Sequence, residues 1–321
     1  MNTKIKIIAF LLSLTSLAGS LSAQEYTIYN QYHFHNYLMN PASAGAAECT
    51  HFMLTHKQQW IGLKDAPNTQ ILSFQTRMRK GGLGLGAYLF NDKNGYSYQQ
   101  GAQVTVAYHI PMSRGNRYTK SPTLDRQLSF GVSGKFYRYQ IGQEVIDHAN
   151  NEGENIQRRH GIYPNANVGV FFQDYNFFAG LSVTNLIPIR PDLFGESEPI
   201  PPLTGMLQLG YAFDTGRDSQ LEPSVVYKMD INTRAQLDFG LRYIQHIDSN
   251  DLSWWAGIIA KQNLDSRYKG LSLMPHFTVR IGKFRVGYAL SLDLNRLISH
   301  SYATHELMLG YSLCSTKKFC R

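Results

Sequence analysis

The sequence predicts an all-β protein, a transmembrane antiparallel β-barrel of about 14 strands that follows a cleaved N-terminal signal peptide. Three observations predict it. A basic and then apolar leader opens the chain, and only 17% of the 321 residues are charged while 12% are aromatic, against about 25% charged residues in an average soluble domain. Apolar and polar residues also alternate with period two through most of the chain, which is typical of half-exposed strands.

The composition excludes several other classes. A mean hydropathy of −0.29 argues against a polytopic helical membrane protein, and the many aromatic residues argue against disorder. Three cysteines are too few for a disulfide-dense scaffold or a four-thiolate zinc site. The formal charge of +8 comes from scattered residues without a run of five, so we expect no nucleic-acid partner.

The leader has the three parts of a secretory signal peptide. Lys4 and Lys6 precede an apolar stretch at 7–17, and small residues lead up to Ala23, after which we expect cleavage. The apolar stretch is too short for a membrane anchor. Residues 1–23 are therefore predicted to be a signal peptide, and the mature chain is predicted to reach the bacterial outer membrane.

Residues 24–49 are polar and aromatic, and they lack the alternation seen later. About 25 residues cannot form a domain of their own. This segment is predicted to be either a periplasmic lead-in or a plug, ahead of a barrel that covers 50–321.

The predicted strands alternate large apolar residues with small or polar ones, as Leu207, Leu209 and Tyr211 do with Gln208 and Gly210. Runs of about ten residues fit transmembrane strands better than the five or six residues usual in a sandwich. The predicted runs are 51–60, 69–79, 82–91, 99–110, 126–138, 165–174, 176–184, 203–214, 219–229, 233–246, 251–263, 268–281, 283–293 and 303–313.

The connections fit a barrel whose termini are periplasmic. The two longest gaps, 139–164 and 185–202, would then face outward and most short turns inward. The gap at 111–125 breaks this rule, so either the strand count slips there or the loop has a role. The residues predicted for the interfacial aromatic girdles are Trp60, Tyr108, Tyr175, Tyr227, Trp254, Trp255 and Tyr268.

The mature chain carries a set of short motifs. They are Gln31-Tyr32, Asn40-Pro41-Ala42 with Gly45, Gln59-Trp60 with Gly62, Ala66-Pro67 with Thr69, the Gly82–Gly86 run, Ala107-Tyr108-His109 and the final His305–Tyr311 stretch. Together these motifs resemble the PorP/SprF family of the type IX secretion and gliding machinery. Two departures are Ser43, where the family often has an aromatic residue, and Asp65, where it often has glycine.

The resemblance implies a non-enzymatic outer-membrane component that binds secreted surface proteins or helps deliver and anchor them. The implied partners are secreted adhesins or other proteins with C-terminal sorting domains, periplasmic type IX secretion components and outer-membrane lipid. The alternatives are a solute porin or uptake channel of the same architecture and, third, a barrel enzyme.

No motif predicts a catalytic, cofactor or metal site. The Gly82–Gly86 run has the spacing GxGxG inside a strand and not a GxGxxG turn before a helix, so we interpret it as small residues in the barrel wall. The pairs His33/His35 and His305/Glu306 lack further ligands at metal-site spacing, and no nucleophile elbow occurs.

The cysteines allow a disulfide at the periplasmic rim. Cys49 precedes the first predicted strand, Cys314 ends the last, and Cys320 follows. One bond is expected, Cys49 to Cys314 or Cys320, or a Cys314–Cys320 loop, with three free thiols as the alternative.

Charged residues on the predicted inner face could line a channel or a plugged lumen, and the sequence leaves this open. They are Lys135, Asp238, Arg242, Arg280, Arg285 and Asp293.

Overall fold

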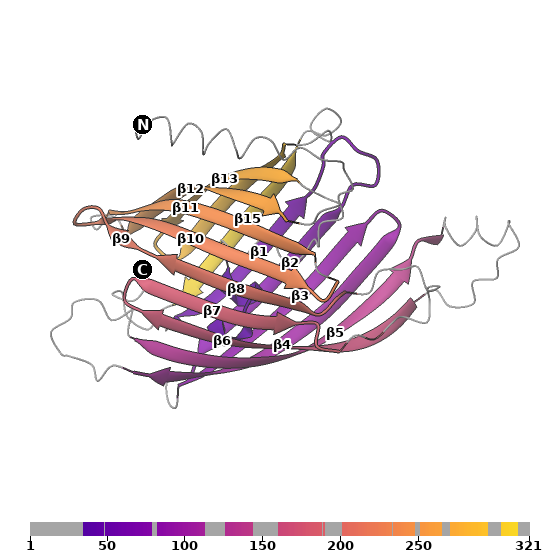
Figure 1. Ribbon diagram of the computed structural model, residues 1–321, viewed down its shortest axis with the longest axis horizontal. Coiled ribbons are helices and arrows are strands. Elements are labelled where there is room, and N and C mark those ends of the chain that lie inside the picture. The colour runs from indigo at the N-terminus through magenta and orange to yellow at the C-terminus, as the bar shows by residue number, and fades with distance from the viewer. Residues whose placement is uncertain are drawn as a thin grey trace, which may run out of the picture.

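The computed structural model describes residues 35–47, 49–78, 82–112, 126–143, 160–187, 189, 201–232, 234–247, 251–264, 270–294 and 303–313. The predicted signal peptide (residues 1–23), Gln31, Tyr32, His33, Tyr268, Cys314 and Cys320 lie outside them. The strands form one antiparallel sheet that wraps into a barrel (Figure 1). They are β1 (Thr50–Gln58), β2 (Asn68–Arg77), β3 (Leu83–Asn94), β4 (Ser97–Pro111), β5 (Gln127–Ile141), β6 (His160–Asp174), β7 (Phe177–Thr184), β8 (Thr204–Tyr211), β9 (Phe213–Asp214), β10 (Ser219–Asp230), β11 (Ala235–Ile247), β12 (Leu252–Asn263), β13 (Leu271–Ile281), β14 (Phe284–Asp293) and β15 (Thr304–Leu313).

The barrel is closed and has 14 strands, as predicted. The first and last strands pair along their whole length, from Thr50 opposite Leu313 to Gln58 opposite His305, and every strand also pairs with its other neighbour in the ring. The short β9 continues β8 past Ala212, because both pair with β10 in the same register. Closure leaves no free edge, which a wall in lipid requires.

The connections define two rims. The terminal rim carries the start of β1, the end of β15 and the short turns 175–176 and 282–283, and the opposite rim carries the longer connections 142–159 and 185–203. The connection 112–126 lies on the terminal rim, so the strand count does not slip there. Residues 113–125 of this loop lie outside the described residues.

The two faces of the wall have the predicted chemistry. Outward positions are large and apolar, as at Leu207, Leu209 and Leu241, which stay 40–46% exposed. Inward positions are buried and mostly polar or small. The inward orientation predicted for Lys135, Asp238, Arg242, Arg280, Arg285 and Asp293 is confirmed by the alternation of exposure along their strands.

Trp255 was predicted in the outer aromatic girdle, and this is wrong. It shares the inward face of β12 with Ser253 and Ile259, whereas its neighbour Trp254 faces outward and contacts the rings of Tyr243 and Phe277. Two adjacent tryptophans must point to opposite faces of a strand.

The start of β6 differs most from its prediction among the strands that begin early. β6 starts at His160 and not at 165, because the stretch with Gly161 and Pro164, two residue types unusual inside a strand, still pairs with β5, Gly161 opposite Tyr139 and Pro164 opposite Phe136. No helix in the described part of the chain is long and apolar enough to cross a membrane.

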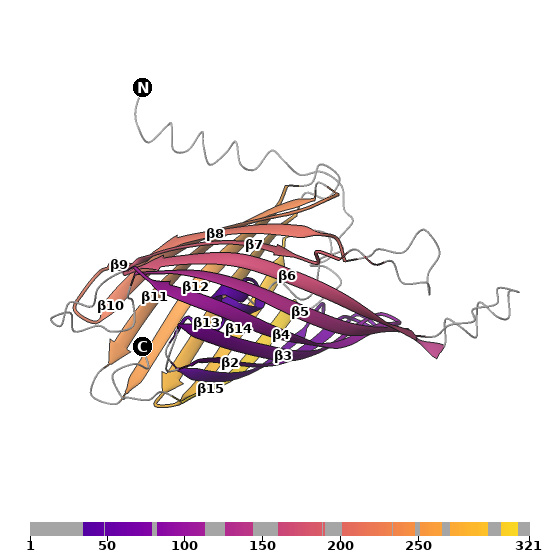
Figure 2. The same ribbon diagram turned by 90° about the horizontal axis from the view of Figure 1, so that it is seen from below.

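A short segment lies inside the ring of strands. Residues 35–47 form two 3-10 helices, η2 (Asn36–Leu38) and η3 (Pro41–Ser43), visible in indigo within the barrel in Figure 2. We call residues 35–47 the inner segment. All residues of its two helices except Asn36 are buried, and its polar groups bond to inward groups of β2 and β4–β8.

Candidate functional site

The inner segment is fixed to the wall mainly through Asn40. Its Oδ1 accepts from Ala42 N at 2.9 Å and so caps η3, and its Nδ2 donates to Val170 O at 2.9 Å and to Leu181 O at 3.4 Å. An asparagine supplies both an acceptor and two donors, so one side chain caps the helix and anchors it to β6 and β7. Ser182 Oγ adds a bond to Met39 O at 2.9 Å.

Glycines in the wall let the inner segment approach closely. A Cβ at Gly131 of β5 would lie 2.5 Å from Pro41 O, and one at Gly169 of β6 would overlap Asn40 Oδ1. Pro41 occupies the first position of η3, where its missing N–H costs nothing.

The last turn of the inner segment bonds to wall residues near the terminal rim. Because Ala44 O can only accept, His109 Nε2 donates to it at 3.0 Å, and His109 Nδ1 bonds to Ser129 Oγ at 2.8 Å. Gly45 has a φ of +70° and lies against Thr76, so a side chain there is excluded by conformation and by space.

Tyr37 fixes the deeper part of the inner segment. Its hydroxyl shares a 2.9 Å hydrogen bond with Thr105 Oγ1, and its ring covers Gly86, where a Cβ would lie 2.6 Å from Tyr37 Cζ. Gly84 and Gly86 thus face inward in the wall, as the interpretation of the Gly82–Gly86 run expected, while Gly82 takes a positive φ before β3.

The second group of motif residues lies at the opposite rim, in the connection between β1 and β2. We call residues 59–67 the rim loop; Gln59 N donates to Pro67 O at 2.9 Å and closes it. Trp60 Nε1 donates to Asp293 Oδ2 of β14 at 3.0 Å, and Trp60 N donates to Thr304 Oγ1 of β15 at 3.3 Å. The rim loop is therefore fastened across the pairing of β1 with β15.

The backbone of the rim loop takes left-handed conformations at Trp60 (φ 44°), Gly62 (φ 99°) and Asp65 (φ 55°). The value at Asp65 explains why a glycine would fit this position, since glycine adopts positive φ without steric cost. Lys93 Nζ lies 3.5 Å from Asp65 Oδ1, and Gly95 N donates to Asp65 O. The rim loop thus reaches from β14 to the β3–β4 turn.

Cys49 is disulfide-bonded. The candidate partners Cys314 and Cys320 both lie outside the described residues, so the choice between them stays a prediction.

Ion pairs cross the lumenal face on the other half of the wall. Lys57 Nζ lies 3.7 Å from Glu306 Oε1 where β1 meets β15, and both side chains are almost fully buried. Lys228 pairs with Asp238 at 3.2 Å between β10 and β11. The sequence had indicated inward charge here, but it gave no sign of which charges pair, because pairing depends on strand register.

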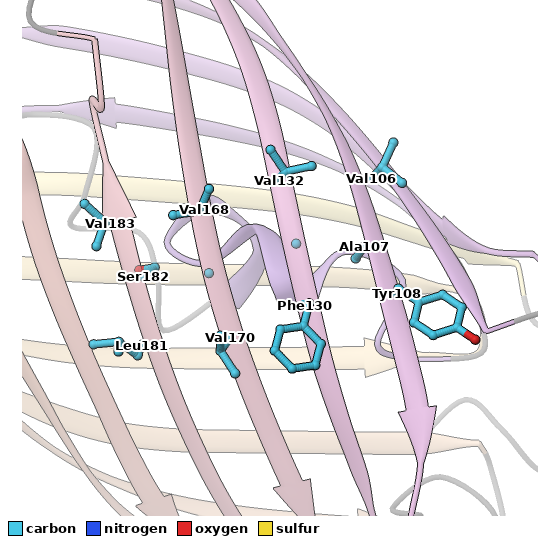
Figure 3. A pocket seen from close by; sticks show the side chains of 12 residues that line it. Val106, Ala107, Tyr108, Phe130, Val132, Val168, Val170, Leu181, Ser182 and Val183 are labelled. Atoms are coloured by element: carbon cyan, nitrogen blue, oxygen red, sulfur yellow. The ribbon is translucent and has the colours of Figure 1, made fainter.

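The outer wall carries a hollow of about 500 Å³ over β4–β7 (Figure 3). Valines at four register-matched positions, Val106, Val132, Val168 and Val183, form its centre, and Tyr108, Phe130 and Leu181 lie toward one end. The hollow lies on the apolar face, so lipid is the medium that meets it. The inner segment passes behind the same strands.

Among the candidate metal ligands, His35, His305 and Glu306 lie in the described part of the chain, and they do not gather. His35 lies in the lumen near Ser73, His305 bonds to Tyr288 on the outer face, and Glu306 faces Lys57. Over the described ranges, no group of three or more His, Cys, Asp or Glu side chains could hold a metal ion.

A closed 14-strand barrel with an apolar outer band, polar lumen and internal segment defines an outer-membrane β-barrel protein. The family model described as type IX secretion system membrane protein PorP/SprF matches residues 21–311. The chain therefore belongs to the PorP/SprF family and is an outer-membrane component of type IX secretion.

The chain is also similar to solved structures of low sequence identity. Omp33 of Acinetobacter baumannii is 10% identical, with a TM-score of 0.44 over 84% of this chain and 99% of that one. A deltaS2S3 mutant of the monoaromatic hydrocarbon channel TodX is 11% identical, with a TM-score of 0.49 over 92% and 96%. The toluene transporter TodX of P. putida is 10% identical, with a TM-score of 0.48 over 86% and 92%. All three scores are below 0.5, so they say nothing about what this chain binds. No curated protein matches the sequence.

Proposed function

We propose that this protein is a non-enzymatic anchor of the type IX secretion machinery that binds secreted surface proteins at its rims and helps to deliver and hold them. The inner segment carries the proposal. Buried hydrogen bonds from Asn40, Ser182 and His109 hold it in the lumen, so the chain itself takes up part of the interior. A solute channel needs that space open.

The rim loop supports a contact surface at the opposite rim. Contacts of Trp60 with Asp293 and of Asp65 with Lys93 hold it in place. Ile61 nevertheless remains 37% exposed, and Gly62 and Lys64 are also exposed. A rigid loop that presents apolar surface fits a protein partner better than a solvated turn does. The partner at this rim would be a secreted adhesin or another protein with a C-terminal sorting domain, and periplasmic components would meet the terminal rim.

The test is affinity purification of the tagged full-length chain from outer membranes in mild detergent, followed by mass spectrometry. Wild type should recover a secreted protein with a C-terminal sorting domain or periplasmic secretion components. The variant Ile61→Glu should lose the secreted partner. The control Ile231→Glu places the same charge at an exposed position in another turn of the opposite rim, and it should retain the partner.

Planar-bilayer recordings of the same preparations separate the proposal from the porin alternative. The anchor should show no steady open conductance. A clean barrel that brings no partner and conducts ions would overturn the proposal and favour the porin or uptake channel.

A further inference from the structure

The lumenal wall formed by β12–β14 carries two arginines that oppose each other. Arg280 of β13 and Arg285 of β14 are direct cross-strand partners on the inward face. Like charges in this position destabilise a sheet unless a counter-charge is present. Arg280 Nη2 lies 3.9 Å from Asp251 Oδ1, a mostly exposed carboxylate. Among the residues that the structure describes, no carboxylate lies within ion-pair distance of Arg285.

Buried hydrogen-bond donors without acceptors surround these arginines. Trp255 Nε1, Thr278 Oγ1 and Arg285 Nε are all buried and make no hydrogen bond. Trp255 and Thr278 are direct cross-strand partners, and Arg285 Cζ lies 5.1 Å from the centre of the Trp255 ring. Thr278 pairs with Gly287, two positions from Arg285 on the same face. Three adjacent strands thus bring three unsatisfied donors into one patch.

The patch lies at the mouth of the barrel. Arg285 is the second residue of β14 from the terminal rim, and Arg280 is the second from the end of β13. The cross-strand partner of Arg285 on β15 is Gly310, which leaves room for the Arg285 side chain. A ligand on the side of the membrane that faces the terminal rim would meet this patch first.

We propose that Trp255, Thr278 and Arg285, assisted by Arg280, form a binding site for anionic oxygens, either a phosphate or a carboxylate. An indole and a guanidinium can only donate, so the patch requires an acceptor. Water could accept these hydrogen bonds but would supply no counter-charge to the Arg285 guanidinium, whereas an oxyanion does both. Arginine also matches phosphate and carboxylate geometry.

Two sources of this chemistry are possible, a free oxyanion and an acidic side chain of a polypeptide that docks at the terminal rim. The experiment uses the full-length chain in detergent at constant ionic strength. It is titrated with sodium phosphate and, separately, with a hexaglutamate peptide, while tryptophan fluorescence and melting temperature are followed. Binding of phosphate alone would assign a free oxyanion, and tighter binding of the peptide would assign a polypeptide.

The variants are Arg285→Gln and Thr278→Val. Loss of a charged donor should weaken binding by about tenfold or more, and loss of the hydroxyl should weaken it several-fold. Arg126→Gln is the matched control, because Arg126 is exposed at the terminal rim and forms an ion pair with Asp174. This variant should bind both probes with the affinity of wild type.

Two results would overturn the site. One is the lack of a saturable response to both probes in wild type, and the other is unchanged affinity in both variants. Thr278→Val keeps the test informative if Arg285→Gln does not fold. Neither result bears on the secretion partner, whose recovery is measured separately.

Discussion

One methyl group added to the inner wall should release the inner segment. Gly131→Ala places a Cβ 2.5 Å from Pro41 O, and Gly169→Ala places one 3.0 Å from Asn40 Cγ. Gly134→Ala is the matched control, since it lies on the same strand as Gly131 but faces outward with no atom within 4 Å.

The size of the effect follows from the contacts. The 2.5 Å distance between the added Cβ and Pro41 O must lengthen by about 1 Å to reach ordinary packing distances. Such a shift would stretch the 2.9 Å bonds of Asn40 to Val170 O and of Ser182 to Met39 O beyond hydrogen-bonding distance. Each lost bond costs about 0.5–1.5 kcal/mol net. Together with overpacking, the docked state should lose about 2–3 kcal/mol, a ~30- to 150-fold rise in the released fraction.

Hydrogen exchange followed by mass spectrometry measures this directly, because buried amides exchange at a rate set by the opening equilibrium. Peptides that cover residues 40–46 should exchange ~30- to 150-fold faster in Gly131→Ala and Gly169→Ala, and conductance should appear in bilayers. Gly134→Ala should match wild type. Equal acceleration in all three variants, or none in the two inward ones, would refute the role of the glycines.

Three further predictions concern the pairing of β1 with β15 and the rim loop. Lys57→Met should cost about 3–5 kcal/mol because it leaves the buried Glu306 carboxylate unpaired, and adding Glu306→Met should recover most of this in urea unfolding. We propose Cys314 as the partner of Cys49, because extending the Thr50–Leu313 register by one residue pairs these two; non-reducing peptide mapping should find the bond, and Cys49→Ser should cost about 2–4 kcal/mol. Trp60→Phe should cost about 1 kcal/mol through its lost indole bond, again in urea unfolding.

Each of these has a contrary outcome. A Lys57→Met/Glu306→Met double variant no more stable than Lys57→Met would show that the pair does not act as a unit. A mapped Cys49–Cys320 peptide would reject the register argument. For Trp60, unchanged stability would mean that the rim loop is held by its other bonds.

Most of the fold followed from the sequence because one rule governs a membrane barrel. Outward residues must suit lipid, so the period-two pattern is strong enough to give the strand count and most boundaries. The prediction failed where the alternation weakened, as at 160–164, where Gly161 and Pro164 are untypical of a strand but pair with β5. Trp255 was misplaced because aromatic content near a strand end does not reveal which face a residue takes, whereas parity within β12 does.

The arrangement of the lumen could not be predicted in the same way. Which wall glycine meets which residue of the inner segment depends on contacts such as that of Gly169 with Asn40, 129 positions apart, and no local pattern encodes them. The motif residues before and after β1 indicated the family, but they did not indicate where these residues lie in the barrel. The structure shows that Asn40 and Pro41 serve the inner segment and that Trp60 serves the rim loop.

The interior is divided between two kinds of wall, and this bears on function. The strands that receive η3 carry glycines toward the inner segment and valines toward lipid at neighbouring positions, as Gly131 and Val132 do, so the wall there is thin and shaped for its own chain. The facing strands carry ion pairs and the Arg285 patch. A general diffusion pore needs no such fitted segment, whereas an anchor gains rigidity from it. Under the proposed function, recognition is therefore left to the rims, with the rim loop on one side and the patch at the mouth on the other.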